Sequence, residues 1–182
     1  MNAPVLHFTP RAELEPQVNL QAFVELCRKS EVMGARLQFD KNVWEDGFLK
    51  GQNKVNRVVF STLEAASGGN PEPSLPEPFL NFAKAAVVYL QDKRPVTSQS
   101  TRIAALRCLE AALRRESKGS RPTAVDPVVL DSAVALAKEQ VSKPVAYRIA
   151  GQLEYISEFM ATNHFISLRQ RWKHGMKKPQ EV

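Results

Sequence analysis

Residues 97–107 read Thr97-Ser98-Gln99-Ser100-Thr101-Arg102-Ile103-Ala104-Ala105-Leu106-Arg107, a polar and basic start that leads into an apolar helix. Residues 143–149 repeat this arrangement as Lys143-Pro144-Val145-Ala146-Tyr147-Arg148-Ile149. The first turn of a helix presents free backbone N–H groups and the positive end of the helix dipole, so it suits a phosphate group. The pattern therefore favours DNA over a small substrate.

Both stretches belong to a run of four amphipathic segments. Apolar residues at helical spacing predict helices from Phe79 to near Arg94, from about 98 to 117, from the cap Asp126 onward, and from Ser142 to about Asn163. Proline and glycine separate them at short intervals. Short connections between amphipathic helices are typical of a compact bundle, so we predict a four-helix bundle over residues 79–163 with no strand within residues 98–163.

The residues before this run predict a small α+β module over 1–66. Asn19 can cap a helix that ends near Ser30, because the apolar residues after it recur at helical spacing. Residues 35–39 and 55–60 alternate or are rich in β-branched residues, and we expect two strands there, paired as a hairpin. Residues 67–78 hold four prolines and two glycines, which predicts a linker.

The basic charge lies almost entirely in the second part of the chain. Residues 1–74 hold 8 Lys and Arg against 9 Asp and Glu, a net charge of −1, whereas residues 75–182 hold 17 against 10, a net charge of +7. A basic excess favours nucleic acid, because binding releases the counterions condensed on the phosphates. The same excess is also compatible with a basic face that only contacts solvent.

Other classes of protein find little support in the sequence. No apolar run approaches the length of a membrane span and no signal peptide is visible, so we expect a cytoplasmic protein. Cys27 and Cys108 are far apart, and we interpret them as buried free thiols. The three histidines have no carboxylate or cysteine at ligand spacing, and no serine has a base beside it. We therefore expect no metal, no cofactor and no enzymatic activity in this chain.

Residues 75–165 resemble the core-binding domain of tyrosine recombinases of the phage-integrase type, a SAM-like helical bundle. The resemblance rests on the aromatic first helix Phe79-Leu80-Asn81-Phe82-Ala83-Lys84 and on the Ser/Thr-rich turn that opens the basic second helix, Thr97 to Arg102. It implies one half of a clamp around duplex DNA, with the second and fourth helices at the major groove, and other recombinase protomers as partners. The DNA-binding residues so implied are Ser98, Gln99, Ser100, Arg102 and Arg107 on the second helix, and Lys143, Tyr147 and Arg148 on the fourth.

Helical spacing adds one residue to this set. Ser100, Arg107 and Arg114 are seven positions apart and fall together on one flank of the second helix, so Arg114 is included as a DNA-binding candidate. Trp172 lies among basic residues, and the interpretation favoured for it is packing against the domain, or disorder in a fragment.

The family's catalytic domain has no counterpart here. Its arginines, lysine, histidines and nucleophilic tyrosine would follow the end of this chain, and the tyrosines present, Tyr89, Tyr147 and Tyr155, lie in predicted helices without an Arg-His cluster. The sequence is thus interpreted as the amino-terminal, non-catalytic part of a longer recombinase, with residues 166–182 as a basic linker. Two alternatives stay open: a dimeric helix-turn-helix regulator, and a helical protein-interaction module whose basic face is incidental.

Overall fold

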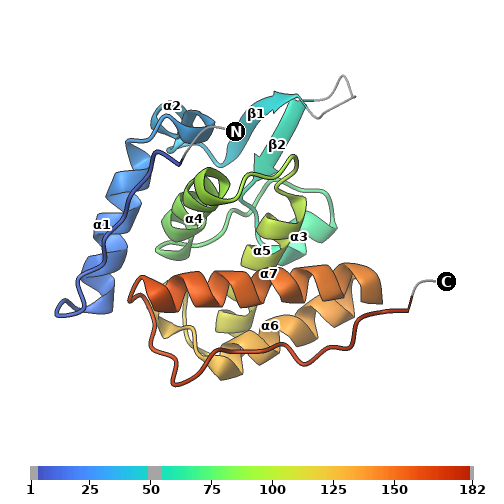
Figure 1. Cartoon of the computed structure of the whole chain (residues 1–182). Helices are drawn as coiled ribbons and strands as arrows, with labels where there is room; N and C mark the ends of the chain where they lie inside the picture. The colour runs from blue at the N-terminus through green and yellow to red at the C-terminus, as the bar shows by residue number, and fades with distance from the viewer. Residues whose placement is uncertain (1–3, 49–54, 181–182) are drawn as a thin grey trace.

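The computed structural model describes residues 4–48 and 55–180, which form a mainly helical fold with one small sheet (Figure 1). The long helices are α1 (Pro16–Arg28), α4 (Phe79–Lys93), α5 (Ser100–Arg115), α6 (Pro127–Gln140) and α7 (Lys143–Thr162). Two short helices, α2 (Ala35–Gln38) and α3 (Leu63–Ser67), flank the antiparallel strands β1 (Val43–Phe48) and β2 (Val55–Val59). None of the described helices is both long and apolar enough to cross a membrane.

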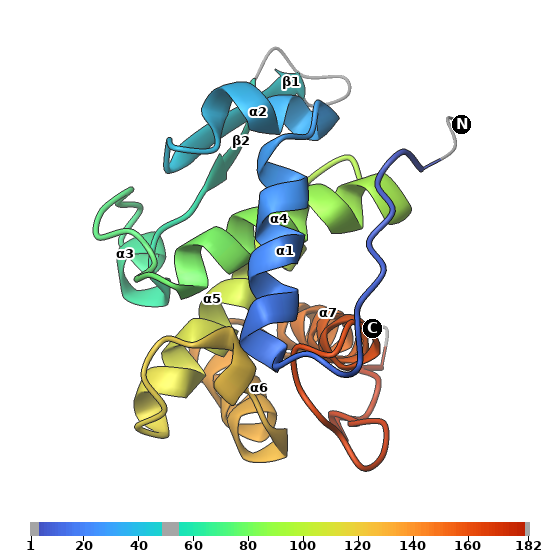
Figure 2. The same ribbon diagram turned by 90° about the vertical axis from the view of Figure 1, so that its left-hand side faces the viewer.

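Helices α5, α6 and α7 pack against one another, and α4 packs against α5 on one side and α1 on the other. Figure 1 looks nearly along α4 while α7 runs across the view, and Figure 2 reverses these directions, so α4 lies crosswise to α7. The four predicted helices are present, and residues 98–163 contain no strand, as predicted. Their arrangement does not confirm a four-helix bundle.

The predicted start signals of the last two helices are confirmed. Asp126 accepts a hydrogen bond from the Val129 backbone N–H at 2.9 Å, and Pro127 occupies the first helical position. Helix α7 begins at Lys143 directly after Ser142, with Pro144 in its first turn. A proline is tolerated there because its missing N–H would have had no partner within the helix.

The predicted hairpin is present, but the prediction of its first strand at residues 35–39 is wrong. Residues 35–39 form α2 and its end, and the strand that pairs with β2 is Val43–Phe48, with Trp44 opposite Val58. The alternation over 35–39 also places Ala35 and Phe39 four residues apart, on one face of a helical turn, and both are buried while Leu37 is exposed. Five residues are too few to distinguish the two-residue period of a strand from the 3.6-residue period of a helix.

The start of α1 was also misplaced. The helix begins at Pro16, and Asn19 lies inside it rather than capping it. The buried Asn19 side chain instead accepts a hydrogen bond from the Arg11 backbone N–H and donates one to the Arg11 carbonyl, each at 3.0 Å. This amide therefore holds the preceding residues onto the helix.

One continuous hydrophobic core includes residues from both sides of the expected linker. Phe23 of α1 and Trp44 of β1 belong to the same buried cluster as Phe82 and Leu106. Residues 68–78 lie outside helices and strands apart from a bridge between Ser61 and Ser74, yet Leu75 is buried and its N–H donates to the Phe60 carbonyl at 2.9 Å. The segment predicted to be a linker is thus anchored to the core.

The carboxyl-terminal segment, expected to be a basic linker over residues 166–182, is packed against the domain, and Trp172 packs as its favoured interpretation expected. Ile166 and Trp172 are buried, and the Trp172 indole donates to Asp131 of α6 at 3.0 Å. The chain then runs back along α7, where Arg171 pairs with Glu158 and His174 with Glu154. We call residues 165–176 the tail. Its aromatic side chains, Phe165 and Trp172, pack into the core, although the basic residues around Trp172 made the sequence look like a linker.

Candidate nucleic-acid interface

A hollow of about 400 Å³ opens where the α4–α5 connection meets the middle of α7. We call it the arginine hollow, because the described residues that line it include three arginines and no carboxylate. Its lining residues are Arg94, Val96, Ser98, Thr101, Arg102, Arg148, Gly151, Gln152 and Tyr155. Three of the predicted site residues, Ser98, Arg102 and Arg148, therefore come together from the second and fourth helices of the predicted set.

The buried side of the hollow is organised by Gln91. Its side-chain oxygen accepts hydrogen bonds from the Val96 N–H, from the Gln99 amide at 2.7 Å and from Arg102, while its NH₂ donates to the Val96 carbonyl. These bonds fix the 94–99 turn and the start of α5. Gln99 is 1% exposed, so it shapes the turn and is not available to DNA, which corrects its predicted role.

Arg102 is also buried, at 3% exposure. Its Nη1 donates to Gln99 at 3.0 Å and its Nη2 donates to the Arg94 carbonyl at 3.1 Å. Burial lowers the pKa of this guanidinium, and no carboxylate among the described residues pairs with it. Arg102 thus supplies positive charge from below the surface. Direct contact with DNA, as predicted for it, does not fit this burial.

Two buried polar atoms of the hollow have no hydrogen-bond partner within the described part of the chain. They are Nε of Arg102, a donor, and Oε1 of Gln152, an acceptor. Buried polar groups are nearly always paired, and an unpaired one costs free energy. Their presence in one hollow indicates a place where an outside molecule or water completes the hydrogen bonding.

The exposed rim consists of Arg94, Arg148 and Ser98. The Arg94 guanidinium stands 5.5 Å from the centre of the Tyr155 ring, a distance typical of a cation–π contact. Ser98 hydrogen-bonds to Ser100 at 3.2 Å, and the Gln99 side chain accepts no capping hydrogen bond from a described backbone N–H of α5. Both serines are exposed, as a phosphate contact requires.

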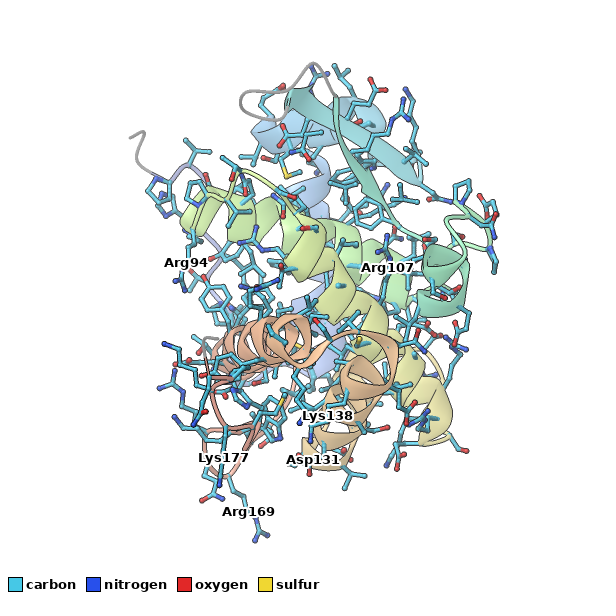
Figure 3. The ribbon with its side chains drawn as sticks, turned by 90° about the vertical axis from the view of Figure 1, so that its right-hand side faces the viewer. Arg94, Arg107, Asp131, Lys138, Arg169 and Lys177 are labelled. Atoms are coloured by element: carbon cyan, nitrogen blue, oxygen red, sulfur yellow. The ribbon has the colours of Figure 1, made fainter. Side chains whose placement is uncertain are left out.

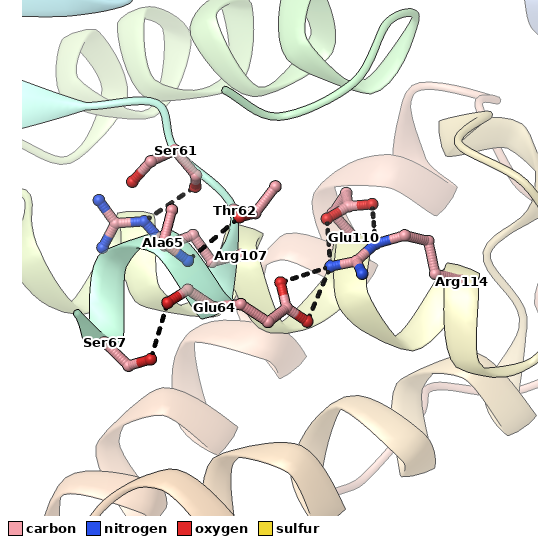
Figure 4. A network of polar contacts seen from close by, with 8 residues as sticks. All are labelled: Ser61, Thr62, Glu64, Ala65, Ser67, Arg107, Glu110 and Arg114. Carbon is pink, nitrogen blue, oxygen red and sulfur yellow. Dashed lines mark hydrogen bonds and ion pairs between the residues drawn. The ribbon is translucent and has the colours of Figure 1, made fainter. Parts of the chain in front are cut away.

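Arg107 and Arg114 lie elsewhere, on the flank of α5 that the spacing of seven predicted. This flank is covered by β2 and α3, and Figure 3 labels Arg107 at the right of the view and Arg94 at the left. Arg107 donates to the Val59 carbonyl at 2.6 Å and the Ser61 carbonyl at 3.2 Å. Arg114 pairs with Glu64 at 2.9 Å and Glu110 at 2.7 Å (Figure 4). Both predicted DNA contacts are therefore structural bonds within the chain.

The start of α7 divides its candidates between two faces. Tyr147 is half-buried, and its ring meets His174 of the tail edge-on at a centroid distance of 5.3 Å. Arg148 is one position further along, about 100° around the helix, and faces the arginine hollow. Lys143 is exposed at the first position of the helix. Tyr147 of α7 thus packs against the tail.

Arg94, Gln91, Gln152 and Tyr155 were missed in the sequence. Arg148, Gln152 and Tyr155 follow the i, i+4, i+7 spacing of one helix face, which was a readable signal. Arg94 was interpreted only as the end of a helix, because nothing local shows that the turn after it folds back onto α7.

Comparison with known proteins adds no relative: no family model, no curated protein and no solved structure matches this chain. Within residues 4–48 and 55–180, no group of three or more His, Cys, Asp or Glu side chains is arranged to hold a metal ion. The function is therefore argued from the arginine hollow itself.

Proposed function

We propose that this chain binds duplex DNA through the arginine hollow, as the non-catalytic, amino-terminal part of a site-specific tyrosine recombinase. The observation that carries the proposal is the meeting of Arg94, Arg102 and Arg148 in one hollow whose described lining holds no carboxylate. The resemblance to core-binding domains supports it, because that family uses its second and fourth helices on DNA, and the hollow lies between α5 and α7. On this proposal helices α4, α5, α6 and α7 act as a core-binding bundle in the cytoplasm, together with other protomers on the DNA.

The three arginines have different tasks. Arg148 and Arg94 are exposed and reach phosphate oxygens, while Ser98 and Thr101 offer hydroxyl donors from the start of α5. Arg102 stays buried and adds charge beneath them. Because bonds to phosphate position a protein without reading sequence, the hollow acts as an anchor, and base recognition falls to neighbouring exposed side chains such as Ser100 and Lys143.

The test is a titration of a fluorescent 30-base-pair duplex with the whole chain. Fluorescence anisotropy measures binding at several salt concentrations. Each phosphate interaction that a substitution removes should make the slope of log K against log salt shallower by about 0.9. We expect this for Arg148→Gln and for Arg94→Gln, and nearly twice as much for the double variant. An unchanged slope in the double variant would refute the proposal.

Arg121→Gln is the matched control. Arg121 is exposed in the connection before α6, near the end of α5 that lies away from the hollow, and it belongs to no ion pair with another described residue. The substitution removes the same charge at a different place. A loss of affinity as large in this variant as in Arg148→Gln would show that binding follows net charge, as expected for an interaction module with an incidental basic face.

Two further measurements separate the alternatives. A footprint with two-fold symmetry would favour a helix-turn-helix dimer over a recombinase domain. Incubation with a nicked suicide substrate should give no covalent adduct, because we expect no activated tyrosine nucleophile here. A tyrosine–DNA adduct would overturn that expectation.

A further inference from the structure

A second hollow, of about 410 Å³, lies on the outer face of the hairpin. We call it the hairpin hollow. Its apolar walls include Val43, Val59 and Pro71, and its polar lining consists of Arg57, Ser61, Asn70 and Arg107. It is separate from the arginine hollow, with which it shares no lining residue.

Arg107 brings a positive charge into this hollow without a carboxylate to balance it. Its hydrogen-bond partners are the carbonyls of Val59 and Ser61, and within the described residues no carboxylate lies within 4.0 Å of it. Nε and one hydrogen of Nη2 make these two bonds, so three of the five guanidinium N–H donors are left. A half-buried cation with free donors is poorly solvated, and an anion would relieve that cost.

Ser61 provides the second, independent observation. The residue is 0% exposed, and its hydroxyl has no hydrogen-bond partner among the described residues. Figure 4 shows the hydroxyl and the Arg107 guanidinium on the same side of the β2–α3 connection. A buried hydroxyl beside an unbalanced guanidinium forms a two-point site for an oxygen anion.

We propose that the hairpin hollow binds a monocarboxylate with a short apolar chain. Arg57 pairs with Glu45 at 3.5 Å, so among the described residues that line the hollow Arg107 is the guanidinium without a carboxylate, and it matches a single negative charge. Val43, Val59 and Pro71 match an acyl chain, and Asn70 adds a polar group at the rim. The bound carboxylate would accept hydrogen bonds from Arg107 and Ser61 and would hold β2 against α5.

The probe is hexanoate, titrated into the ¹⁵N-labelled chain and followed by NMR. We expect saturable shifts at the amides of residues 57–61, 66–70 and 107, and at least tenfold weaker binding of hexanamide, which keeps the shape and lacks the charge. Inorganic phosphate should not compete at equal concentration. Shifts spread over exposed lysines, equal binding of hexanamide, or stronger shifts with phosphate would each overturn the proposal.

Ser61→Ala is the decisive variant, and Ser67→Ala on the neighbouring α3 is its control. Ser61→Ala removes a hydroxyl without a partner, so the fold should persist, while hexanoate binding should weaken about tenfold, the effect of one hydrogen bond to a charged group. Ser67 is exposed and bonds to the Glu64 carbonyl, outside the hollow. Equal affinity of both serine variants would refute the site. Arg148→Gln should bind hexanoate like the parent, so a failure of DNA binding and a failure of this site are distinguishable.

Discussion

The Trp172 indole donates a hydrogen bond to the Asp131 carboxylate at 3.0 Å and thereby joins the tail to α6 across 41 residues of sequence. Trp172 is 7% exposed, so its ring is also a hydrophobic anchor. Arg171 and His174 on either side of it pair with Glu158 and Glu154 of α7. The tail is therefore a structural element of the domain.

Trp172→Ala should lower the free energy of unfolding by about 3–5 kcal/mol, the usual cost of removing a buried tryptophan side chain. Urea unfolding followed by circular dichroism measures it. Asp131→Asn keeps an acceptor for the indole and should cost about 1 kcal/mol or less. If Trp172→Ala matches the parent within about 0.5 kcal/mol, the tail does not anchor the domain.

Arg107→Met should loosen the hairpin without changing the salt dependence of DNA binding. The substitution leaves the Val59 and Ser61 carbonyls without their donor, which should cost about 2–3 kcal/mol. Amide hydrogen exchange should quicken at residues 55–60 more than in α6. A salt slope as shallow as that of Arg148→Gln would show that Arg107 contacts phosphate after all.

Arg114→Met should destabilise the domain by about 2 kcal/mol, because it leaves the Glu110 carboxylate, which is 0% exposed, without its cation. Arg114 itself is 42% exposed, so water limits the cost. Arg115→Met is the matched control, since Arg115 pairs with Glu139 at the surface and its loss should matter far less. Equal losses of stability in the two variants would contradict a special role for Glu110.

The same arginine affects the acid stability through Glu64. Burial raises the pKa of the Glu64 carboxyl, but the hydrogen bond from Arg114 and further bonds outweigh this and leave the pKa below its usual value. A carboxyl of lowered pKa adds stability above its unfolded pKa, and this is lost as the pH falls through the folded pKa. Between about pH 5 and pH 3, Arg114→Met should therefore lose less stability than the parent. If the free energy of unfolding falls equally with pH in Arg114→Met and in the parent, the Arg114–Glu64 pair does not contribute to acid stability.

Cys108 should affect stability at alkaline pH. Burial raises the pKa of its thiol to about 11, partly offset by the charge of Arg107. A raised pKa contributes stability that is complete below the unfolded pKa, near 8.5, and is lost as the pH rises through the folded value. We expect Cys108→Ala to lose less stability than the parent between about pH 8.5 and pH 10.5. A thiol reagent at pH 8 should label Cys108 only on unfolding; rapid labelling of the native chain would contradict its burial.

The sequence alone determined the elements whose signals are local. Four helices with their proline and aspartate starts, the strand at 55–59 and the buried thiols follow from spacing and capping within a few residues. Over the five residues 35–39 the helical and strand periods coincide, and only the packing of Ala35 and Phe39 against the core distinguished them.

The tertiary structure decided which basic residues face solvent. Spacing placed Arg107 and Arg114 on one flank, but β2 and α3, distant in sequence, cover that flank and take up their hydrogen bonds. The same folding brings Arg94 to Arg148 and seats Trp172 on α6. Local periodicity fixes the direction of a side chain relative to its own helix, whereas its exposure depends on contacts between segments that no local pattern encodes.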